Sequence, residues 1–223
     1  MRGIFITIEG PDGSGKSTQG QRVFKYLQEK GYEVVLTREP GGTSIGEQIR
    51  SVLLNPENNE MGFKTEVLLY AASRAQHLKE VIIPSLKEGK IVISDRFVDS
   101  SIAYQGYGRS LNRSLVVEIN KLVVEDYLPD LTIFLDLPVE VGLTRIRRNQ
   151  KSMDRLEQEA IAFHEQVYQG FKRLALDEKR IKTISADDSE DVIFARIIKL
   201  LEEQLSERKS EVRSQKSEIG KSL

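Results

Sequence analysis

The sequence predicts an α/β fold in which helices cover both faces of a five-stranded parallel sheet. Three observations lead to this prediction. Short apolar runs rich in β-branched residues alternate with segments of helical spacing, an alternation typical of parallel sheets. The runs are apolar at consecutive positions, as expected of strands that are buried on both faces. Hydrophobic residues make up 39% of the 223 residues, which is enough for a single core.

The strands are the most clearly marked elements. The five expected strands are IFITIE (4–9), EVVLT (33–37), IVISD (91–95), LTIFLDL (131–137) and IKTIS (181–185). A helix is expected to begin in the glycine-rich loop after the first strand and to end at Lys30, because Gly31 provides a helix stop. Ser44 and Glu47 have the spacing of a capping box and predict a second helix that runs to about Leu54.

Helical spacing continues through the rest of the chain. It returns over about residues 65–77 and again before Gly89. Between the third and fourth strands, Leu115, Ile119 and Leu122 recur at helical spacing and predict one buried helix face. Further helices are expected before and after the last strand, which completes the alternation of strands and helices.

Bulk composition narrows the class of protein. The net charge of −1 gives no overall field that would attract nucleic acid or anionic lipid. The absence of cysteine excludes a disulfide framework and a thiolate metal site. No run approaches the ~20 apolar residues of a membrane-spanning helix, and the N-terminus lacks a signal-peptide pattern. We expect a cytoplasmic domain over 1–205, without nucleic-acid or membrane partners, and a charged tail over 206–223 that is a frayed helix end or disordered.

The strongest motif joins the first strand to the first helix. It consists of Gly10, Pro11, Asp12, Gly13, Ser14, Gly15, Lys16, Ser17 and Thr18. This spacing, between a strand and a helix, matches the P-loop, in which backbone N–H groups and a helix N-terminus hold phosphates. Lys16 is expected to reach the β- and γ-phosphate oxygens, and the Ser17 hydroxyl to bind Mg²⁺. The sequence thus predicts a three-layer P-loop NTPase fold.

The rest of the chain distinguishes among P-loop proteins. A GTPase needs an Asn-Lys-x-Asp guanine reader, but the only Asn-Lys pair, Asn120-Lys121, lies within a helical segment. A motor or helicase would normally need a longer chain. A small kinase needs arginines that bind the acceptor anion. Such arginines stand at loops and helix starts, namely Arg38, Arg50, Arg74 and Arg96.

Asp95 and Arg96 follow the third strand directly. Because ligands of open α/β sheets bind beyond the carboxyl ends of the strands, both residues are expected at the phosphates. Asp95 would hold Mg²⁺ through water, and Arg96 would clamp an acceptor phosphate with two hydrogen bonds. Asp136, at the end of the fourth strand, is the rival carboxylate for the metal. It has no neighbouring arginine, so we favour Asp95.

Six segments together resemble a known family. EGPDGSGKST, TREPGGT, LLYAASR, DRFVDSSIAYQG, PDLTIFLDL and DRLEQE occur in this order. Over roughly residues 4–201 the chain resembles bacterial thymidylate kinases. The DRFVDSSIAYQG segment combined with REPGG is more specific than the P-loop. The resemblance implies phosphoryl transfer from MgATP to dTMP, giving dTDP. It also implies a small helical lid and a homodimer.

The resemblance also implies roles for individual residues. Asp12 matches a carboxylate near the acceptor sugar and the clamping Arg96. Tyr70 matches a ring that stacks on thymine, and Arg74 a donor to thymine O4. Tyr104 matches the ring that crowds the sugar 2′ position. The other implied acceptor-binding residues are Glu39, Arg50, Ser101 and Gln105, the last two at positions that read the other base edge.

The implied lid spans about residues 145–157 and is rich in arginine. The P-loop itself contains no arginine, so the resemblance places the catalytic arginine in the lid. We assign it to Arg148, with Arg147 and Lys151 as alternatives, because the alignment is ambiguous there. Arg145 matches a position over the adenine plane. A run of arginines on a helix is otherwise a solvated face.

Two other functions remain open from the sequence. The nearer is a kinase for a different small acceptor, such as another nucleoside monophosphate or a deoxynucleoside. The AYQG segment and Arg74 argue against it. The farther is a regulator that binds nucleotide without turnover. The combination of Lys16, Ser17, Asp95 and Arg96 with a basic lid argues against that.

Overall fold

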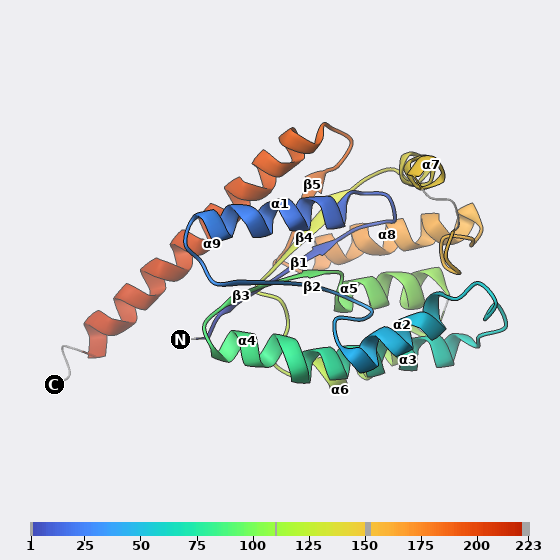
Figure 1. Cartoon of the computed structure of the whole chain (residues 1–223), viewed down its shortest axis with the longest axis horizontal. Coiled ribbons are helices and arrows are strands. Elements are labelled where there is room, and N and C mark those ends of the chain that lie inside the picture. Colours follow the sequence, from blue (N-terminus) through green and yellow to red (C-terminus); the bar gives the residue numbers. More distant parts are fainter. Residues whose placement is uncertain (1, 110, 150–152, 220–223) are drawn as a thin grey trace.

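The sheet of the computed structural model, which describes residues 2–109, 111–149 and 153–219, is parallel throughout (Figure 1). Its strands are β1 (Ile4–Glu9), β2 (Val34–Arg38), β3 (Ile91–Asp95), β4 (Leu131–Asp136) and β5 (Ile181–Ser185). Their order across the sheet is β2-β3-β1-β4-β5. This confirms the predicted α/β architecture. The second strand is shifted by one residue relative to the expected range, and the fourth ends one residue earlier.

Helical segments connect the strands. They are α1 (Lys16–Glu29), α2 (Ser44–Leu54), α3 (Phe63–His77), η1 (Leu78–Ile82), α4 (Ile83–Lys87), α5 (Val98–Ser101), η2 (Ile102–Gly108), α6 (Arg113–Val124), α7 (Val139–Asn149), α8 (Ile161–Asp177) and α9 (Glu190–Ile219). The π-helical segments η1 and η2 continue α3 and α5 without a break. In the described part of the chain, none of the helices combines the length and apolar character needed to cross a membrane.

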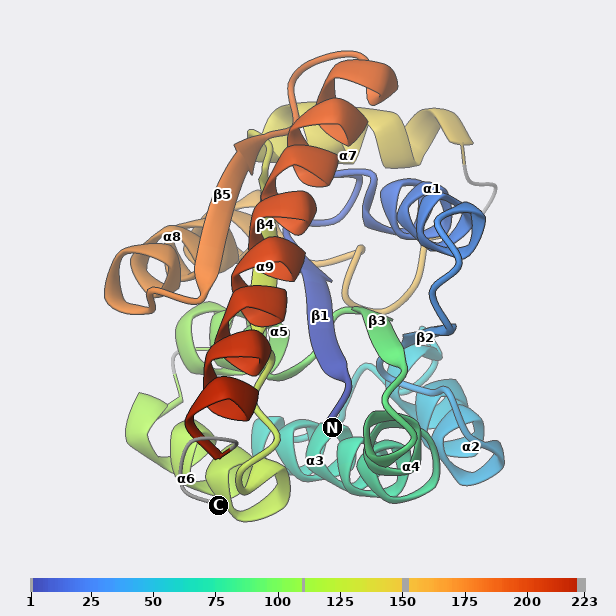
Figure 2. The same ribbon diagram turned by 90° about the vertical axis from the view of Figure 1, so that its left-hand side faces the viewer.

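Helices cover both faces of the sheet, giving three layers (Figures 1 and 2). On one face, α1 and α9 bury Leu27 and Ile197 against strand residues such as Ile6 and Ile133. Strand side chains alternate between faces, so Phe5, the neighbour of Ile6, packs on the opposite side. That side is covered by η1, α4, α6 and α8. The central β1 therefore lies in a dry core and holds its carboxyl-end loop in a fixed place.

Two local predictions were wrong. The N-cap of α2 is Thr43, whose Oγ1 accepts from the Gly46 N–H at 2.9 Å, one residue before the expected capping box. Glu47 instead accepts from the backbone N–H of Gly42 and from Arg38.

The predicted buried face of α6 was also wrong in part, since Leu115 and Ile119 are half-buried. Leu122 is 81% exposed, while Val116, Asn120 and Val124 form the buried face. Asn120 is buried because it accepts a hydrogen bond from Arg74. A pattern of hydrophobic residues gives no signal for such a contact.

Candidate active site

Glycines shape the loop between β1 and α1. Gly10, Gly13 and Gly15 have φ of 148°, 77° and 89°, values that side chains disfavour. A Cβ on Gly13 would also lie 2.3 Å from the carbonyl oxygen of Gly142 in α7. No side chain caps the N-terminus of α1, so its first N–H groups and its dipole are left for an anion. This geometry fits the phosphates of a nucleoside triphosphate.

Lys16 lies beside this loop with little direct compensation for its charge. It is buried, and its Nζ donates to the carbonyl oxygen of Pro11 at 2.8 Å. Burial, with the nearby Arg96 charge, lowers the pKa of Lys16 to about 8. A bound phosphate would supply the negative charge that Lys16 lacks at close range.

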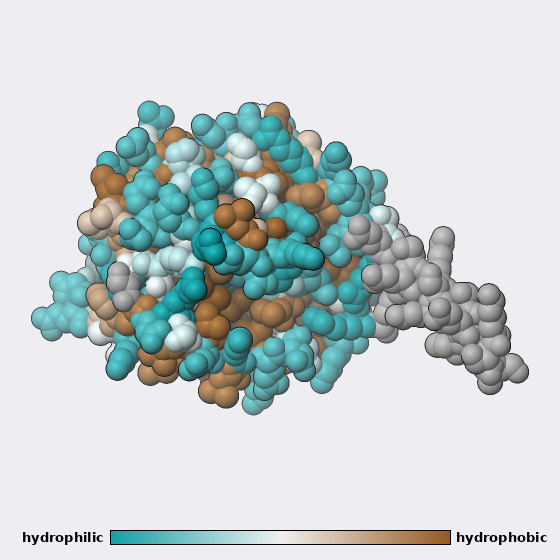
Figure 3. Space-filling model, turned by 180° about the vertical axis from the view of Figure 1, so that it is seen from behind, coloured by the Kyte–Doolittle hydropathy of each residue, from teal (hydrophilic) through white to brown (hydrophobic). Residues whose placement is uncertain are grey.

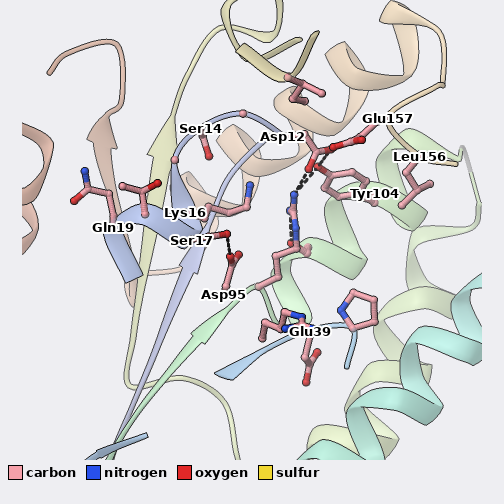
Figure 4. A pocket seen from close by; sticks show the side chains of 18 of the residues that line it. Asp12, Ser14, Lys16, Ser17, Gln19, Glu39, Asp95, Tyr104, Leu156 and Glu157 are labelled. Carbon is pink, nitrogen blue, oxygen red and sulfur yellow. Dashed lines mark hydrogen bonds and ion pairs between the residues drawn. The ribbon is translucent and has the colours of Figure 1, made fainter. Parts of the chain in front are cut away.

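Ser17 and Asp95 meet although they are far apart in sequence. The Ser17 hydroxyl donates to Oδ2 of Asp95 at 2.5 Å, and both groups are seen beside Lys16 (Figure 4). A hydroxyl and a carboxylate oxygen suit Mg²⁺, which prefers hard oxygen ligands. The rival Asp136 instead accepts from Tyr168, and burial with this bond raises the pKa of Tyr168 to about 12. The pair formed by Ser17 and Asp95 therefore fits the metal better.

A cavity of about 770 Å³ opens at the carboxyl ends of the strands. Most of the residues expected at the site line it: Asp12, Gly13, Ser14, Gly15, Lys16, Ser17, Thr18, Glu39, Arg50, Tyr70, Arg74, Asp95, Arg96, Ser101, Tyr104, Gln105 and Arg145.

Gly10 and Pro11 lie behind the loop and present their carbonyl oxygens to Arg96 and Lys16. Arg147 and Arg148 are exposed at the end of α7, outside this lining. Lys151 lies outside the described residues.

Arg96 lines the same cavity as Lys16. It forms an ion pair with Asp12, and its Nη2 donates to the Tyr104 hydroxyl at 3.2 Å. Tyr104 in turn donates to Asp12 at 2.7 Å. Burial alone would lower the pKa of Arg96, but Tyr104 and Asp12 outweigh it and raise that pKa above its usual value. The guanidinium is thus held in place and charged.

The strained backbone at Arg96 is supported by hydrogen bonds from the next residues to Glu9. Its φ of 70° lies in the left-handed region, which costs energy for a residue with a side chain. The buried Glu9 accepts from the Phe97 N–H at 2.7 Å and from the Ser100 hydroxyl at 2.5 Å. Burial, with the nearby Asp99, raises the pKa of Glu9 to about 7. Glu9 was not among the predicted residues, although a glutamate ending an otherwise apolar strand was a signal.

At the far end of the cavity, Arg74 is almost fully buried. Its Nε donates to Glu39 at 2.8 Å, and its Nη2 donates to the Phe97 carbonyl at 3.1 Å and to Ser101 Oγ at 3.0 Å. Nη1 bonds to Asn120, which explains the buried asparagine of α6. The ring of Arg74's neighbour on α3, His77, holds the other oxygen of Glu39 at 2.9 Å.

The remaining predicted residues lie around this end. Arg50 donates to the Pro40 carbonyl at 2.8 Å. Tyr70 is half-buried on α3, where burial raises the pKa of its hydroxyl. Gln105 donates through Nε2 to Glu66 at 2.9 Å, while its Oε1 is buried without a hydrogen-bond partner among the described residues. Arg145 approaches the carbonyl oxygens of Gly13 and Ala186.

Two further segments line the cavity, one within the implied lid and one after β5, and none of their residues was assigned an individual role. Asp154 and Glu157 bond reciprocally to each other's backbone N–H groups at 2.9 Å. This turn places Leu156 and Glu157 over Tyr104 and Asp12 (Figure 4). The loop after β5 contributes Asp188, Ser189 and Glu190. Its position at a strand's carboxyl end was the signal that could have identified it.

Comparisons with known proteins show to which of them this chain is similar in sequence and fold. The sequence profile of the family described as thymidylate kinase matches residues 8–197. A thymidylate kinase of Clostridium novyi is 50% identical over 198 residues, covering 88% of this chain and 97% of that protein. One of Halothermothrix orenii is 51% identical, covering 88% and 95%. The crystal structure of a thymidylate kinase from Ehrlichia chaffeensis superposes with a TM-score of 0.74 at 36% identity, covering 91% of this chain and 99% of that one.

Proposed function

This chain belongs to the thymidylate kinase family, and we propose that it transfers the γ-phosphoryl group of MgATP to dTMP, giving dTDP and ADP. The observation that carries the proposal is the arrangement of the cavity. The P-loop lysine and a fixed arginine, Arg96, line one cavity. The same cavity is lined by a buried donor, Arg74, and by Gln105, whose Oε1 is buried without a hydrogen-bond partner among the described residues.

The donor side would hold ATP through the loop and α1. Backbone N–H groups at the start of α1 would bind the phosphates, and Lys16 would follow the charge that develops during transfer. Ser17 and Asp95 would hold Mg²⁺, which would supply neutralisation of phosphate charge when bound. No cluster of three or more His, Cys, Asp or Glu suited to a metal occurs among the described residues. Arg145 would lie against the adenine.

The acceptor side would position a phosphate that is already anionic, so no general base is required. Catalysis then rests on alignment and on charge stabilisation. Arg96 would hold the dTMP phosphate with its planar fork, and Asp12 fixes that fork while lying near the sugar. Glu39 and Arg50 line the same cleft. Tyr104 would occupy the space that a ribonucleotide 2′-hydroxyl needs.

The buried end would read the base. Four of the five N–H groups of Arg74 have acceptors among the described residues, on Glu39, Asn120, Phe97 and Ser101. The remaining Nη1 N–H would donate to thymine O4. Gln105 Oε1 would accept from N3–H, and Tyr70 would stack on the ring. Arginine cannot accept a hydrogen bond, so the 4-amino group of cytosine is disfavoured.

A lid would complete the site during turnover. We assign it to about residues 145–157 of a single kinase domain over 1–205, with Arg148 as the γ-phosphoryl ligand and Arg147 or Lys151 as alternatives. The exposed position of Arg147 and Arg148 supports this role, because a lid residue reaches the phosphate only when the site closes.

We also propose a cytoplasmic homodimer. The supporting observation is a set of exposed apolar side chains on or beside α2, α3 and α6: Ile45, Val52, Phe63, Leu68, Leu122 and Leu128. Figure 3 shows hydrophobic groups along the lower part of the molecule, where these helices lie in Figure 1. Apolar patches of this kind mark protein interfaces. Analytical ultracentrifugation would detect a monomer if this is wrong.

A coupled assay of ADP release across nucleoside monophosphates tests the activity. The expected order of kcat/KM is dTMP, then dUMP, with dCMP, dGMP and UMP far behind. The missing methyl of dUMP is worth about 10–200-fold, whereas an unpaired buried group is worth on the order of 10⁴. A preference for another monophosphate would leave a P-loop kinase but reject thymidylate as the acceptor. Nucleotide binding without ADP release would indicate a regulator.

A further inference from the structure

Glu66 of α3 contacts Gln105, which lines the end of the cavity that would read the base. The Glu66 side chain is completely buried, accepts hydrogen bonds from two side chains and forms an ion pair with a third. Gln105 Nε2 lies 2.9 Å from Oε1, and Arg109 donates through Nε at 3.3 Å and Nη2 at 3.1 Å. Arg155 forms an ion pair with Oε2 at 2.7 Å. Glu66 itself does not line the cavity.

We propose that Glu66 is a specificity-determining positioning residue, which sets thymine against cytosine by fixing the orientation of the Gln105 amide. The inference rests on the proposed function, because it assumes that the cavity receives a pyrimidine nucleotide. Glu66 would not touch that nucleotide. It acts through Gln105, whose two amide orientations present opposite hydrogen-bonding groups to the cavity.

Because Glu66 is ionised, it allows only one orientation of the Gln105 amide. Burial alone would raise the pKa of Glu66, but the Arg109 charge and hydrogen bonds outweigh it and hold that pKa below its usual value. An ionised carboxylate only accepts hydrogen bonds. A flipped Gln105 amide would bring two oxygens together at the 2.9 Å contact, so Nε2 must face Glu66. Oε1 then faces away from Glu66, and it is buried without a partner among the described residues.

Arg74 and Gln105 both line the cavity, so a bound base would meet a fixed donor and a fixed acceptor. Arg74 is a donor held by the buried carboxylate of Glu39 at 2.8 Å. Gln105 Oε1 is an acceptor, fixed in the same way by the buried carboxylate of Glu66. Thymine presents the complementary pair, an O4 acceptor beside an N3–H donor. Cytosine presents the reverse, an amino donor beside an unprotonated N3, so it meets two mismatches rather than one.

The test compares dTMP with 5-methyl-dCMP, because this pair keeps the methyl group and differs only at the edge in question. Wild type should prefer dTMP by on the order of 10⁴ in kcat/KM. In Glu66→Gln the neutral amide can donate or accept, so Gln105 gains its second orientation. The ratio should fall at least about tenfold, the equivalent of one hydrogen bond. A purely structural role would lower both substrates equally and leave the ratio unchanged.

Glu159→Gln is the matched control. Glu159 is the other carboxylate on Arg109, at 2.5 Å, and no bond joins it to Gln105 among the described residues. Its substitution should leave the ratio within about threefold of wild type. If Glu66→Gln does not fold, Glu66→Asp keeps the charge for Arg109 and Arg155 while withdrawing the carboxylate from Gln105 by one methylene, and the ratio should again fall.

A wild-type measurement completes the test without any substitution. In the NMR spectrum of the dTMP complex, the Gln105 side-chain amide protons should be protected from exchange, because Nε2 donates to the buried Glu66. Rapid exchange of those protons would overturn the proposal, as would an unchanged ratio in a folded Glu66 variant. If wild type does not phosphorylate dTMP at all, the proposed function fails instead, and the first assay reveals that separately.

Discussion

The donor and acceptor sides of the cavity are built in different ways. On the donor side, the cradle is a contiguous loop, and Lys16 contacts a carbonyl oxygen five residues away. On the acceptor side, three of the residues that would touch dTMP, Arg96, Arg74 and Gln105, are fixed by distant carboxylates. Arg96 is held by Asp12 across 84 positions, and Arg74 by Glu39 across 35.

This difference follows from what each side has to recognise. A triphosphate is a dense negative charge, and backbone N–H groups at a helix start satisfy it from many angles. A base edge is a row of single donors and acceptors, so its recognition needs side chains of fixed polarity. Buried carboxylates provide that fixation because they only accept hydrogen bonds. We therefore expect donor-side substitutions to affect turnover, and acceptor-side substitutions to affect folding as well.

The largest effect should come from Glu39→Ala. It leaves Arg74 buried without its carboxylate and removes one of the two hydrogen-bond partners of His77 among the described residues. Breaking a buried ion pair in this way typically costs about 3–5 kcal/mol of the free energy of unfolding, which urea denaturation would measure. The control is Asp177→Ala, which breaks an exposed pair with Arg173 and should cost under about 1 kcal/mol. If the two substitutions lowered the free energy of unfolding equally, the proposed difference between the two sides would be wrong.

Lys16→Ala should separate turnover from stability. The loss of one electrostatic contact to the developing charge lowers kcat on the order of 10²–10³-fold. The unfolding free energy should change by under about 1 kcal/mol, because Lys16 donates only one hydrogen bond to a carbonyl. Lys25→Ala, which removes an exposed charge from the same helix, is the control. Turnover within a few-fold of wild type would reject the P-loop assignment.

A smaller effect is expected from the lid arginines. Arg148→Ala, or Arg147→Ala if the alignment slips, should lower kcat at least about tenfold with little change in KM for dTMP. The reason is that the contact forms only in the closed state and strengthens in the transition state. Arg155→Ala should instead lower the free energy of unfolding, since Arg155 is buried, pairs with Glu66 and donates to the Leu53 carbonyl at 2.8 Å. If the Arg147, Arg148 and Lys151 substitutions all leave kcat intact, the lid assignment fails.

The difference between the two sides also explains which features could be predicted from the sequence. The strands and the donor loop were predicted within a residue or two, because their signals are local. Asp95 and Arg96 followed from one topological rule about strand ends. Glu66 and Asn120 were missed because their roles depend on contacts with residues 39 to 46 positions away. Hydrophobic periodicity also missed the most buried face of α6, where Asn120 accepts a hydrogen bond from Arg74.

The smallest predicted effect concerns pH and again divides the two sides. Burial and the Arg96 charge lower the pKa of Lys16 to about 8, so the free enzyme loses this cation as pH rises past 8. ATP binds best to the protonated form, and kcat/KM for ATP should therefore fall roughly fourfold between pH 7 and 8.5. Arg96 keeps its charge, because Tyr104 and Asp12 overcome the effect of burial and raise its pKa. The kcat/KM for dTMP at saturating ATP should stay flat over the same range.

Lys16→Arg is the control, because its guanidinium does not titrate between pH 7 and 8.5. This variant should show no decline of kcat/KM for ATP over that range, whatever activity it retains. A parallel decline for both substrates would place the titrating group elsewhere and contradict the separation of the two sides.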